Sequence, residues 1–257
     1  MDSSAKAREW ATKWSARLAT RVSPADLERL SRTLLTTVDQ VSATRWDAAV
    51  KRAAALPGEL RPDKLKALTD SFARELGVFG AGVGAAAATP VIGTTATVLA
   101  ATAELAWFTS RAGDLVLTVA ALHGRPAPTV DERRAWLLAV LIYGSSARDG
   151  FSKAVSEATM GRSPAATTKL PIHTLQTVNR VLTPQLVKRY GARRGAVALG
   201  TALPLGIGAL VGGSANYVAV RSLARHADTF FARLPYSAID TTAIDVTGAL
   251  PPARPTR

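Results

Sequence analysis

Three ionisable side chains on one expected helix are the residues of this chain best placed to do chemistry. Glu104, Arg111 and Asp114 are seven and then three residues apart, so on an α-helix they lie close to one face. Trp107 and Phe108 share that face. A carboxylate–guanidinium pair in apolar surroundings has perturbed pKa values and can hold a ligand. The same pattern is more often a structural ion pair that offsets its own desolvation, and both interpretations stay open.

A second candidate lies in the uncharged run 195–220. Gly208, Gly212 and Asn216 are four residues apart, which places them on one stripe of a helix. Two glycines there would let a neighbouring backbone approach more closely than the usual 8 to 10 Å or so between helix axes. Asn216 would then need hydrogen-bond partners in an apolar environment, so we expect it to contact another helix or a bound ligand.

Motifs for other chemistry are scarce. Cysteine is absent, and the three histidines, His123, His173 and His226, have no metal-ligand spacing, so neither a metal nor a cofactor is predicted. Gly80-x-Gly82-x-x-Ala85 imitates a dinucleotide-binding fingerprint, but helical sequence precedes it where a strand is required. The chain lacks the sequence patterns of a phosphate-binding loop and of a hydrolase nucleophile elbow. Enzymatic activity stays open, with a non-enzymatic role favoured.

Positive charge dominates the second half of the chain. The formal net charge is +13 and the pI about 10.8, which indicates an anionic neighbour, either nucleic acid or lipid. Residues 158–227 contain no Asp or Glu but nine Lys and Arg. The cations expected at an anionic membrane are Lys188, Arg189, Arg193, Arg194, Arg221 and Arg225. Nucleic acid is not favoured because aromatic residues are rare among them, although a solvated basic face is an alternative.

Helical patterns occupy most of the sequence. We expect an amphipathic helix over 4–21 with Trp10 and Trp14, facing either a membrane interface or the protein core. Further helices are expected from Ser23-Pro24 to about residue 52 with a break, and over 63–76, 94–123 and 131–146. The predicted fold is an all-α multi-helix bundle, with two central Gly/Ala-rich apolar helices and amphipathic helices around them.

Length and composition set the predicted organisation. The chain has 257 residues, of which 47% are hydrophobic and 20% charged. We expect N-terminal amphipathic helices over 1–69, a helical domain over 70–234 and a flexible tail over 235–257. The uncharged runs 76–103 and 195–220 are long enough to cross a bilayer. Their high Gly and Ala content favours burial in a soluble core, and hence a cytoplasmic protein peripheral to the inner membrane face.

Three segments resemble the EcsC family of bacterial proteins. They are ELAWFTSRAGDLVLTVAALHG (104–124), DERRAWLLAVLIYGS (131–145) and ALPLGIGALVGGSANYVAVRSLARHADTFF (202–231). The first matches loosely, because the family usually has Asp-Leu-Pro at 104–106 and Tyr-Gly at 123–124. The family is named for its position beside genes of an ABC transporter. The resemblance implies a helical protein that is membrane-associated or linked to transport, and it transfers no catalytic residue.

These observations predict an accessory or regulatory protein that docks on anionic lipid through its basic region. An ABC transporter is the partner that the resemblance suggests. The alternative is a binder or enzyme for a small lipid-like ligand in an apolar helical cavity, with Glu104, Arg111 and Asn216 as its polar contacts.

Overall fold

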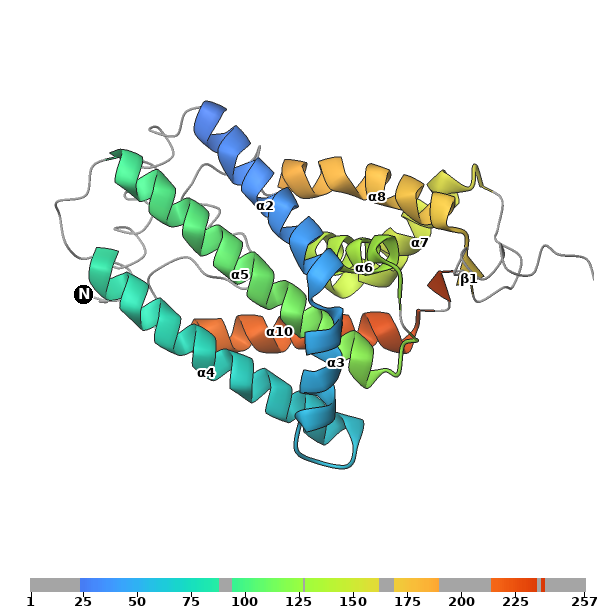
Figure 1. Ribbon diagram of the computed structural model, residues 1–257, viewed down its shortest axis with the longest axis horizontal. Helices are drawn as coiled ribbons and strands as arrows, with labels where there is room; N and C mark the ends of the chain where they lie inside the picture. Colours follow the sequence, from blue (N-terminus) through green and yellow to red (C-terminus); the bar gives the residue numbers. More distant parts are fainter. Residues whose placement is uncertain are drawn as a thin grey trace, which may run out of the picture.

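Helices make up nearly all of the part of the chain described by the computed structural model, which covers residues 24–87, 94–126, 128–161, 169–189, 214–234 and 237–238. The α-helices are α2 (Pro24–Thr44), α3 (Trp46–Ala55), α4 (Arg61–Ala87), α5 (Thr94–Leu122), α6 (Val130–Tyr143), α7 (Ala147–Ala158), α8 (Ile172–Val187) and α10 (Ser214–Ala232). A 3-10 turn, η1 (Gly144–Ser146), joins α6 to α7. The prediction of an all-α bundle is confirmed (Figure 1).

Local sequence explains the helix boundaries. Pro24 opens α2 with Asp26 in its first turn, where a fixed φ and a negative charge both favour a helix start. The Thr129 hydroxyl caps α6 by accepting a hydrogen bond from the Glu132 amide at 3.2 Å. Gly124 adopts a φ of 64° directly after α5, a conformation that glycine adopts without strain. The break expected before residue 52 separates α2 from α3 at Arg45.

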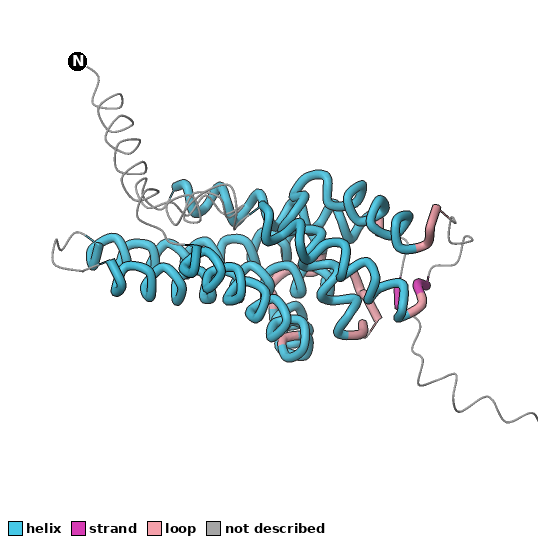
Figure 2. Tube along the Cα trace, turned by 90° about the horizontal axis from the view of Figure 1, so that it is seen from above, coloured by secondary structure: helices cyan, strands magenta, loops and turns pink. Residues whose placement is uncertain are grey.

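α5 and α6 form the centre of the bundle. α5 contacts α2, α3, α4 and α10, while α6 contacts α2, α7 and α8; Figures 1 and 2 show these elements as one elongated body. Trp136 of α6 is 1% exposed. Its ring meets Trp46 and Phe231 edge to face, with centroids 6.4 and 5.1 Å apart. This indole therefore links α6 to α3 and α10.

Gly113 lies where α5 crosses α2. A Cβ atom there would lie 2.6 Å from Cγ1 of Val41, so α2 and α5 can pack at this distance only because α5 has a glycine at the crossing. The predicted close-packing residues, Gly208 and Gly212, lie outside the described residues.

The two uncharged runs have different positions. The first supplies the second half of α4 and the first turns of α5. Only the last seven residues of the second run, 214–220, are described, and they begin α10. One helix in the described ranges is long and apolar enough to cross a membrane, over Leu105–Leu122 of α5, and 67% of that window is buried within the bundle.

One core spans the expected domain boundary. The position between residues 69 and 70 falls inside α4, and Leu30 and Leu34 of α2 share a hydrophobic cluster with Leu115 of α5. From the expected C-terminal tail, Ser237–Ala238 forms strand β2, which pairs in parallel with β1 (Lys169–Leu170). The expected helix over 4–21 and the rest of the tail lie outside the described residues.

Candidate functional site

The uncharged ends of α4 and α5 lie at one end of the bundle, which we call the apolar end (Figure 1). α4 and α5 are antiparallel, so the uncharged stretches 76–87 and 94–103 lie side by side there (Figure 1). α2 and α10 begin at this end, and α8 ends on the same side. The uncharged residues 195–213, between α8 and α10 in the sequence, lie outside the described residues. The uncharged stretches that the structure brings together are those of α4 and α5.

Exposed cations lie on the two helices that flank the second uncharged run. Lys188 and Arg189 directly follow α8, and Arg221 and Arg225 lie on α10; all four are exposed. Val218, Arg221 and Arg225 are spaced three and four residues apart, so they form one stripe. Val218 is 63% exposed and is the residue of this stripe nearest the apolar end. Arg193 and Arg194, also predicted to bind lipid, lie outside the described residues.

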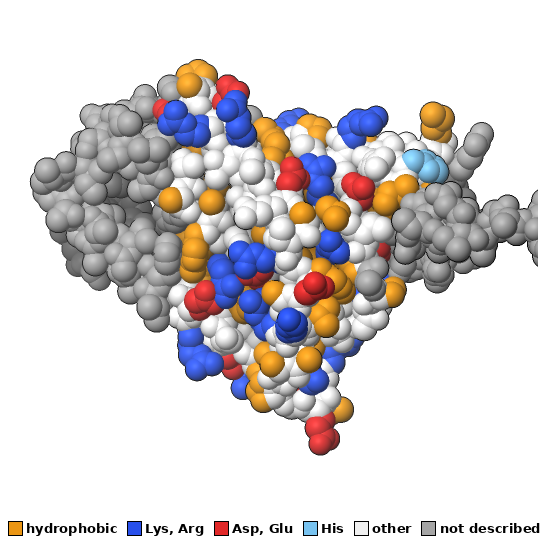
Figure 3. Space-filling model, in the orientation of Figure 1, with side chains coloured by type: hydrophobic (Ala, Val, Ile, Leu, Met, Phe, Trp, Pro, Cys, Tyr) orange, Lys and Arg blue, Asp and Glu red, His pale blue; other side chains and the backbone are white. Residues whose placement is uncertain are grey.

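Charge elsewhere in the described residues is nearly balanced. On the face seen in Figure 3, Lys and Arg side chains are interspersed with Asp and Glu. In contrast, α8, α10 and the residues next to them hold seven cations and one acid, Asp228. The cations are Lys169, Arg180, Lys188, Arg189, Arg221, Arg225 and Arg233. The excess positive charge of the described residues is therefore concentrated on these two helices and their flanks.

The expected Arg111–Asp114 pair is present on α5. The Arg111 Nη1 atom donates to Asp114 Oδ2 at 2.8 Å, and its Nη2 atom donates to Glu75 of α4. The guanidinium carbon lies 4.7 Å from the centre of the Phe72 ring, close enough for a cation–π contact. The Asp114 side chain is 2% exposed. These contacts favour the structural interpretation of the pair, because Arg111 already joins α4 to α5.

For the other two predicted ligand contacts, the structure describes the backbone and not the side chain. Glu104 belongs to α5 and Asn216 to the first turn of α10. Their side chains lie outside what is described. Glu75 is the member of the cluster that sequence reasoning missed. It lies 36 residues before Arg111, on another helix, where helical periodicity gives no signal.

A second cluster, the histidine clasp, consists of His123, Asp228 and Arg61 and joins the end of α5 to α10 and to the start of α4. His123 Nε2 lies 2.9 Å from Asp228 Oδ1, and His123 Nδ1 lies 3.0 Å from Arg61 Nη1. Arginine only donates hydrogen bonds, so we assign Nδ1 as the acceptor and place the ring proton on Nε2. The clasp therefore holds a neutral histidine.

Burial lowers the pKa of two partly buried histidines, His123 and His226. For His123 the main cause is desolvation; the charges of Arg61 and Arg125 act in the same direction, and Asp228 opposes them. For His226 the causes are desolvation and the charge of Arg225. Both therefore bind a proton less readily in the folded protein than in the unfolded chain, whose reference pKa is 6.5.

The protein is expected to lose stability as the pH falls from about 7.5 to about 5.5. Below a pH of about 6.5 the unfolded chain takes up these protons first, so the contribution of both histidines is present above that pH and lost as the pH falls through their lowered pKa values. Thermal unfolding followed by circular dichroism at constant ionic strength measures the slope of the midpoint temperature against pH. The slope should flatten in a His123→Gln, His226→Gln double variant and persist in His173→Gln, which changes an exposed histidine. A midpoint that rises as the pH falls contradicts the assignment.

A hollow of about 420 Å³ opens beside the histidine clasp. Apolar residues of α3 and α5, three of them alanines, line it together with Glu59, Arg61, Lys64 and Arg125. Arg125 donates to the carbonyl oxygens of Phe231 and Leu234 at 2.6 and 2.7 Å, where it satisfies the end of α10.

No protein-family model, curated protein or solved structure matches the chain. The resemblance to the EcsC family therefore stays a prediction that depends on the three segments quoted above. Among the described residues, the apolar end and its flanking cations are the features most informative about function.

Proposed function

We propose that the protein docks on an anionic membrane surface through the apolar end of its bundle. The observation that carries this proposal is that the uncharged ends of α4 and α5 lie together at one end of the bundle, while the end of α8 and the start of α10, with their exposed cations, point toward that end (Figure 1). An accessory or regulatory role, and a link to a transporter, are proposed from the family resemblance alone.

The dimensions of the hairpin suit the outer part of a bilayer. Twelve residues of α4, from Leu76 to Ala87, carry no charge, and a helix of that length extends about 18 Å. The hydrocarbon core of a bilayer is about 30 Å thick, so the hairpin could enter one leaflet without crossing it. Helical backbone satisfies its own hydrogen bonds in lipid, which removes the main cost of insertion.

The exposed cations supply attraction to anionic headgroups. Each Lys or Arg near such a surface contributes about 1 kcal/mol. Lys188 and Arg189 follow α8, and Arg221 lies two turns into α10. Acids that would offset them are few on this side: Asp26 and Glu28 of α2 are accompanied by Arg29 and Arg32. The apolar end therefore combines an uncharged tip with net positive charge.

Flotation with liposomes tests the proposal. We expect recovery with phosphatidylglycerol-containing vesicles, little with phosphatidylcholine alone, and a decrease as salt rises from low to moderate. Reversing three cations in Lys188→Glu, Arg189→Glu, Arg221→Glu should weaken binding by about a hundredfold or more, at about 1 kcal/mol for each charge. Ala87→Glu should also weaken it, because a carboxylate would enter the apolar region.

Matched controls separate location from total charge. Lys51→Glu, Arg148→Glu, Lys153→Glu reverses three exposed cations of α3 and α7 and should leave recovery nearly unchanged. Leu60→Glu places a carboxylate at a residue that is 67% exposed, before α4, and should have the same small effect. Equal recovery with neutral and anionic vesicles would remove the electrostatic basis of the proposal.

A further inference from the structure

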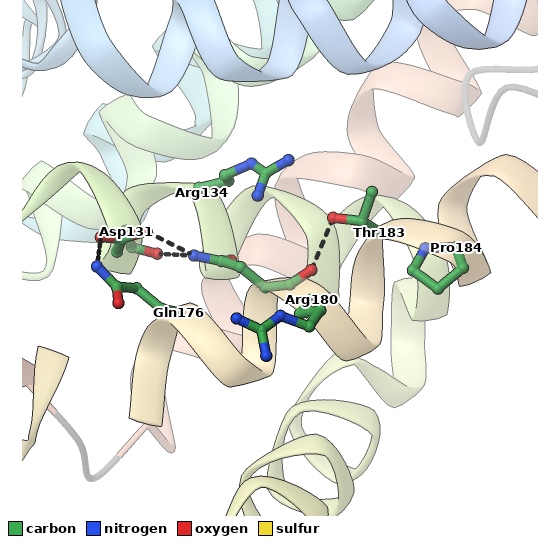
Figure 4. A pocket seen from close by; sticks show the side chains of 7 residues that line it. Asp131, Arg134, Gln176, Arg180, Thr183 and Pro184 are labelled. Atoms are coloured by element: carbon green, nitrogen blue, oxygen red, sulfur yellow. Dashed lines mark hydrogen bonds between the residues drawn. The ribbon is translucent and has the colours of Figure 1, made fainter. Parts of the chain in front are cut away.

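A second hollow, of about 430 Å³, lies between α6 and α8 (Figure 4). Asp131 and Arg134 of α6 line it, together with Gln176 and Arg180 of α8. In Figure 4 the guanidinium groups of Arg134 and Arg180 lie on opposite sides of the space, while Asp131 and Gln176 meet at one end. The volume is in the range of about 300 to 1,000 Å³ that is usual for small-molecule sites.

A buried amide, Asn179, forms part of the lining. Its side chain donates to the Asp131 carbonyl oxygen at 2.9 Å and to Asp131 Oδ1 at 3.2 Å. Asn179 is 1% exposed, and its Oδ1 atom accepts no hydrogen bond from the residues described. Exchanging the amide nitrogen and oxygen would place oxygen against oxygen at Asp131, so the orientation is fixed by its donors. A buried acceptor without a donor is costly, and a bound donor would relieve that cost.

The charges around this hollow are not paired with one another. Among the described residues, the Asp131 carboxylate accepts from two neutral amides, those of Asn179 and of Gln176, the latter at 3.4 Å. No ion pair of Asp131 or Arg180 is present within the described ranges. Arg134 donates its Nε atom to Asp39 of α2 at 2.6 Å, and among the described residues its two terminal nitrogens have no hydrogen-bond acceptor.

We infer that this hollow binds a small zwitterion that carries a carboxylate or phosphate and a protonated amine. The anionic group lies between Arg134 and Arg180, whose guanidinium groups suit oxyanions. The ammonium group lies beside the Asp131 carboxylate, which has no cationic partner among the described residues. A plain anion would be repelled by Asp131 and a plain amine by the two arginines, so the arrangement selects ligands that carry both charges. This inference is independent of membrane docking.

Calorimetric titration of the full chain tests the inference with three probes: O-phosphoethanolamine, inorganic phosphate and ethanolamine. We expect O-phosphoethanolamine to bind at least about tenfold more tightly than either single-charge probe, a difference of about 1.4 kcal/mol. Arg180→Gln should lower its affinity by about tenfold or more. The matched control Arg148→Gln changes an exposed arginine of α7 and should leave the affinity unchanged.

Asp131→Asn distinguishes binding from a purely structural role. Removing the carboxylate should weaken O-phosphoethanolamine binding and leave phosphate binding equal or stronger, so that selectivity disappears. Equal affinity for all three probes, no saturable binding in the wild type, or an unchanged affinity in Arg180→Gln would overturn the inference.

The same chemistry could come from a free metabolite or from a lipid headgroup. Phosphatidylcholine vesicles with and without phosphatidylethanolamine separate these sources, in the background of Lys188→Glu, Arg189→Glu, Arg221→Glu. If the headgroup is the ligand, phosphatidylethanolamine raises recovery and Arg180→Gln abolishes the increase. If the ligand is free, the titration is positive and phosphatidylethanolamine has no effect on flotation.

Discussion

Arg111→Met should lower the free energy of unfolding by about 3–5 kcal/mol, the usual cost of leaving a buried charge without its partner. Asp114, whose side chain is 2% exposed, would lose the guanidinium that donates to it at 2.8 Å. Glu75 would lose its bond across the α4–α5 contact as well. Methionine keeps much of the volume beside Phe72, so the loss reports the charge and not a cavity.

Denaturant unfolding measures this loss. Arg74→Met is the matched control, because Arg74 is exposed on α4 and should change stability by less than about 0.5 kcal/mol. The double variant Arg111→Met, Asp114→Leu removes both charges and should recover most of the stability. If the single and double variants are equally unstable, packing and not charge governs this contact.

Trp136→Ala should lower the free energy of unfolding by about 3–5 kcal/mol, the range measured for buried aromatic residues cut back to alanine. The side chain is 1% exposed and contacts the rings of Trp46 and Phe231. The substitution would leave a cavity where α3, α6 and α10 meet, and the neighbouring rings would lose their edge-to-face contacts.

The same denaturant experiment on Trp107→Ala provides the comparison. Trp107 is only partly buried, beside Phe108 with ring centroids 4.8 Å apart, so a smaller loss is expected. Trp136→Phe should retain part of the stability, because a smaller ring still fills some of the space. Equal losses for Trp136→Ala and Trp107→Ala would contradict the central position of Trp136.

Local signals in the sequence were sufficient for several of the helices, although none was predicted over α7 or α8. Pro24 as a first helical residue and Gly124 after α5 both act over a few neighbouring residues, so they can be interpreted without tertiary structure. The long helix expected over 94–123 is α5, and the helix expected over 131–146 is α6 followed by η1. The region without acids, 158–227, includes α8 and most of α10.

The contacts between helices could not be predicted in the same way. Glu75 meets Arg111 across 36 residues, and His123 meets Asp228 across 105. Helical periodicity relates residues three or four apart, and it says nothing of which helix faces which. The glycine at the α2–α5 crossing was missed for the same reason. A side chain at position 113 is excluded by Val41, which lies on a helix distant in sequence.

The polar hollow between α6 and α8 shows a further limit. Asp131 begins the helix expected over 131–146, and a carboxylate in the first turn of α6 explains its position on that helix. Its contact with Asn179, 48 residues later, depends on how α8 lies against α6. Neither residue belongs to a recognisable motif, so only the packed structure brings the two together.

The β1–β2 pairing has a practical consequence for labelling. It anchors residue 238 opposite the side on which α2 begins, so Pro24 and Ala238 are separated by most of the long axis of the body in Figure 1. A fluorescent or affinity label fused directly after Ala238 would start remote from the hairpin tip. The same label fused before Pro24 would start near the apolar end and compete with the membrane for it. The two fusions should therefore differ in their recovery with vesicles.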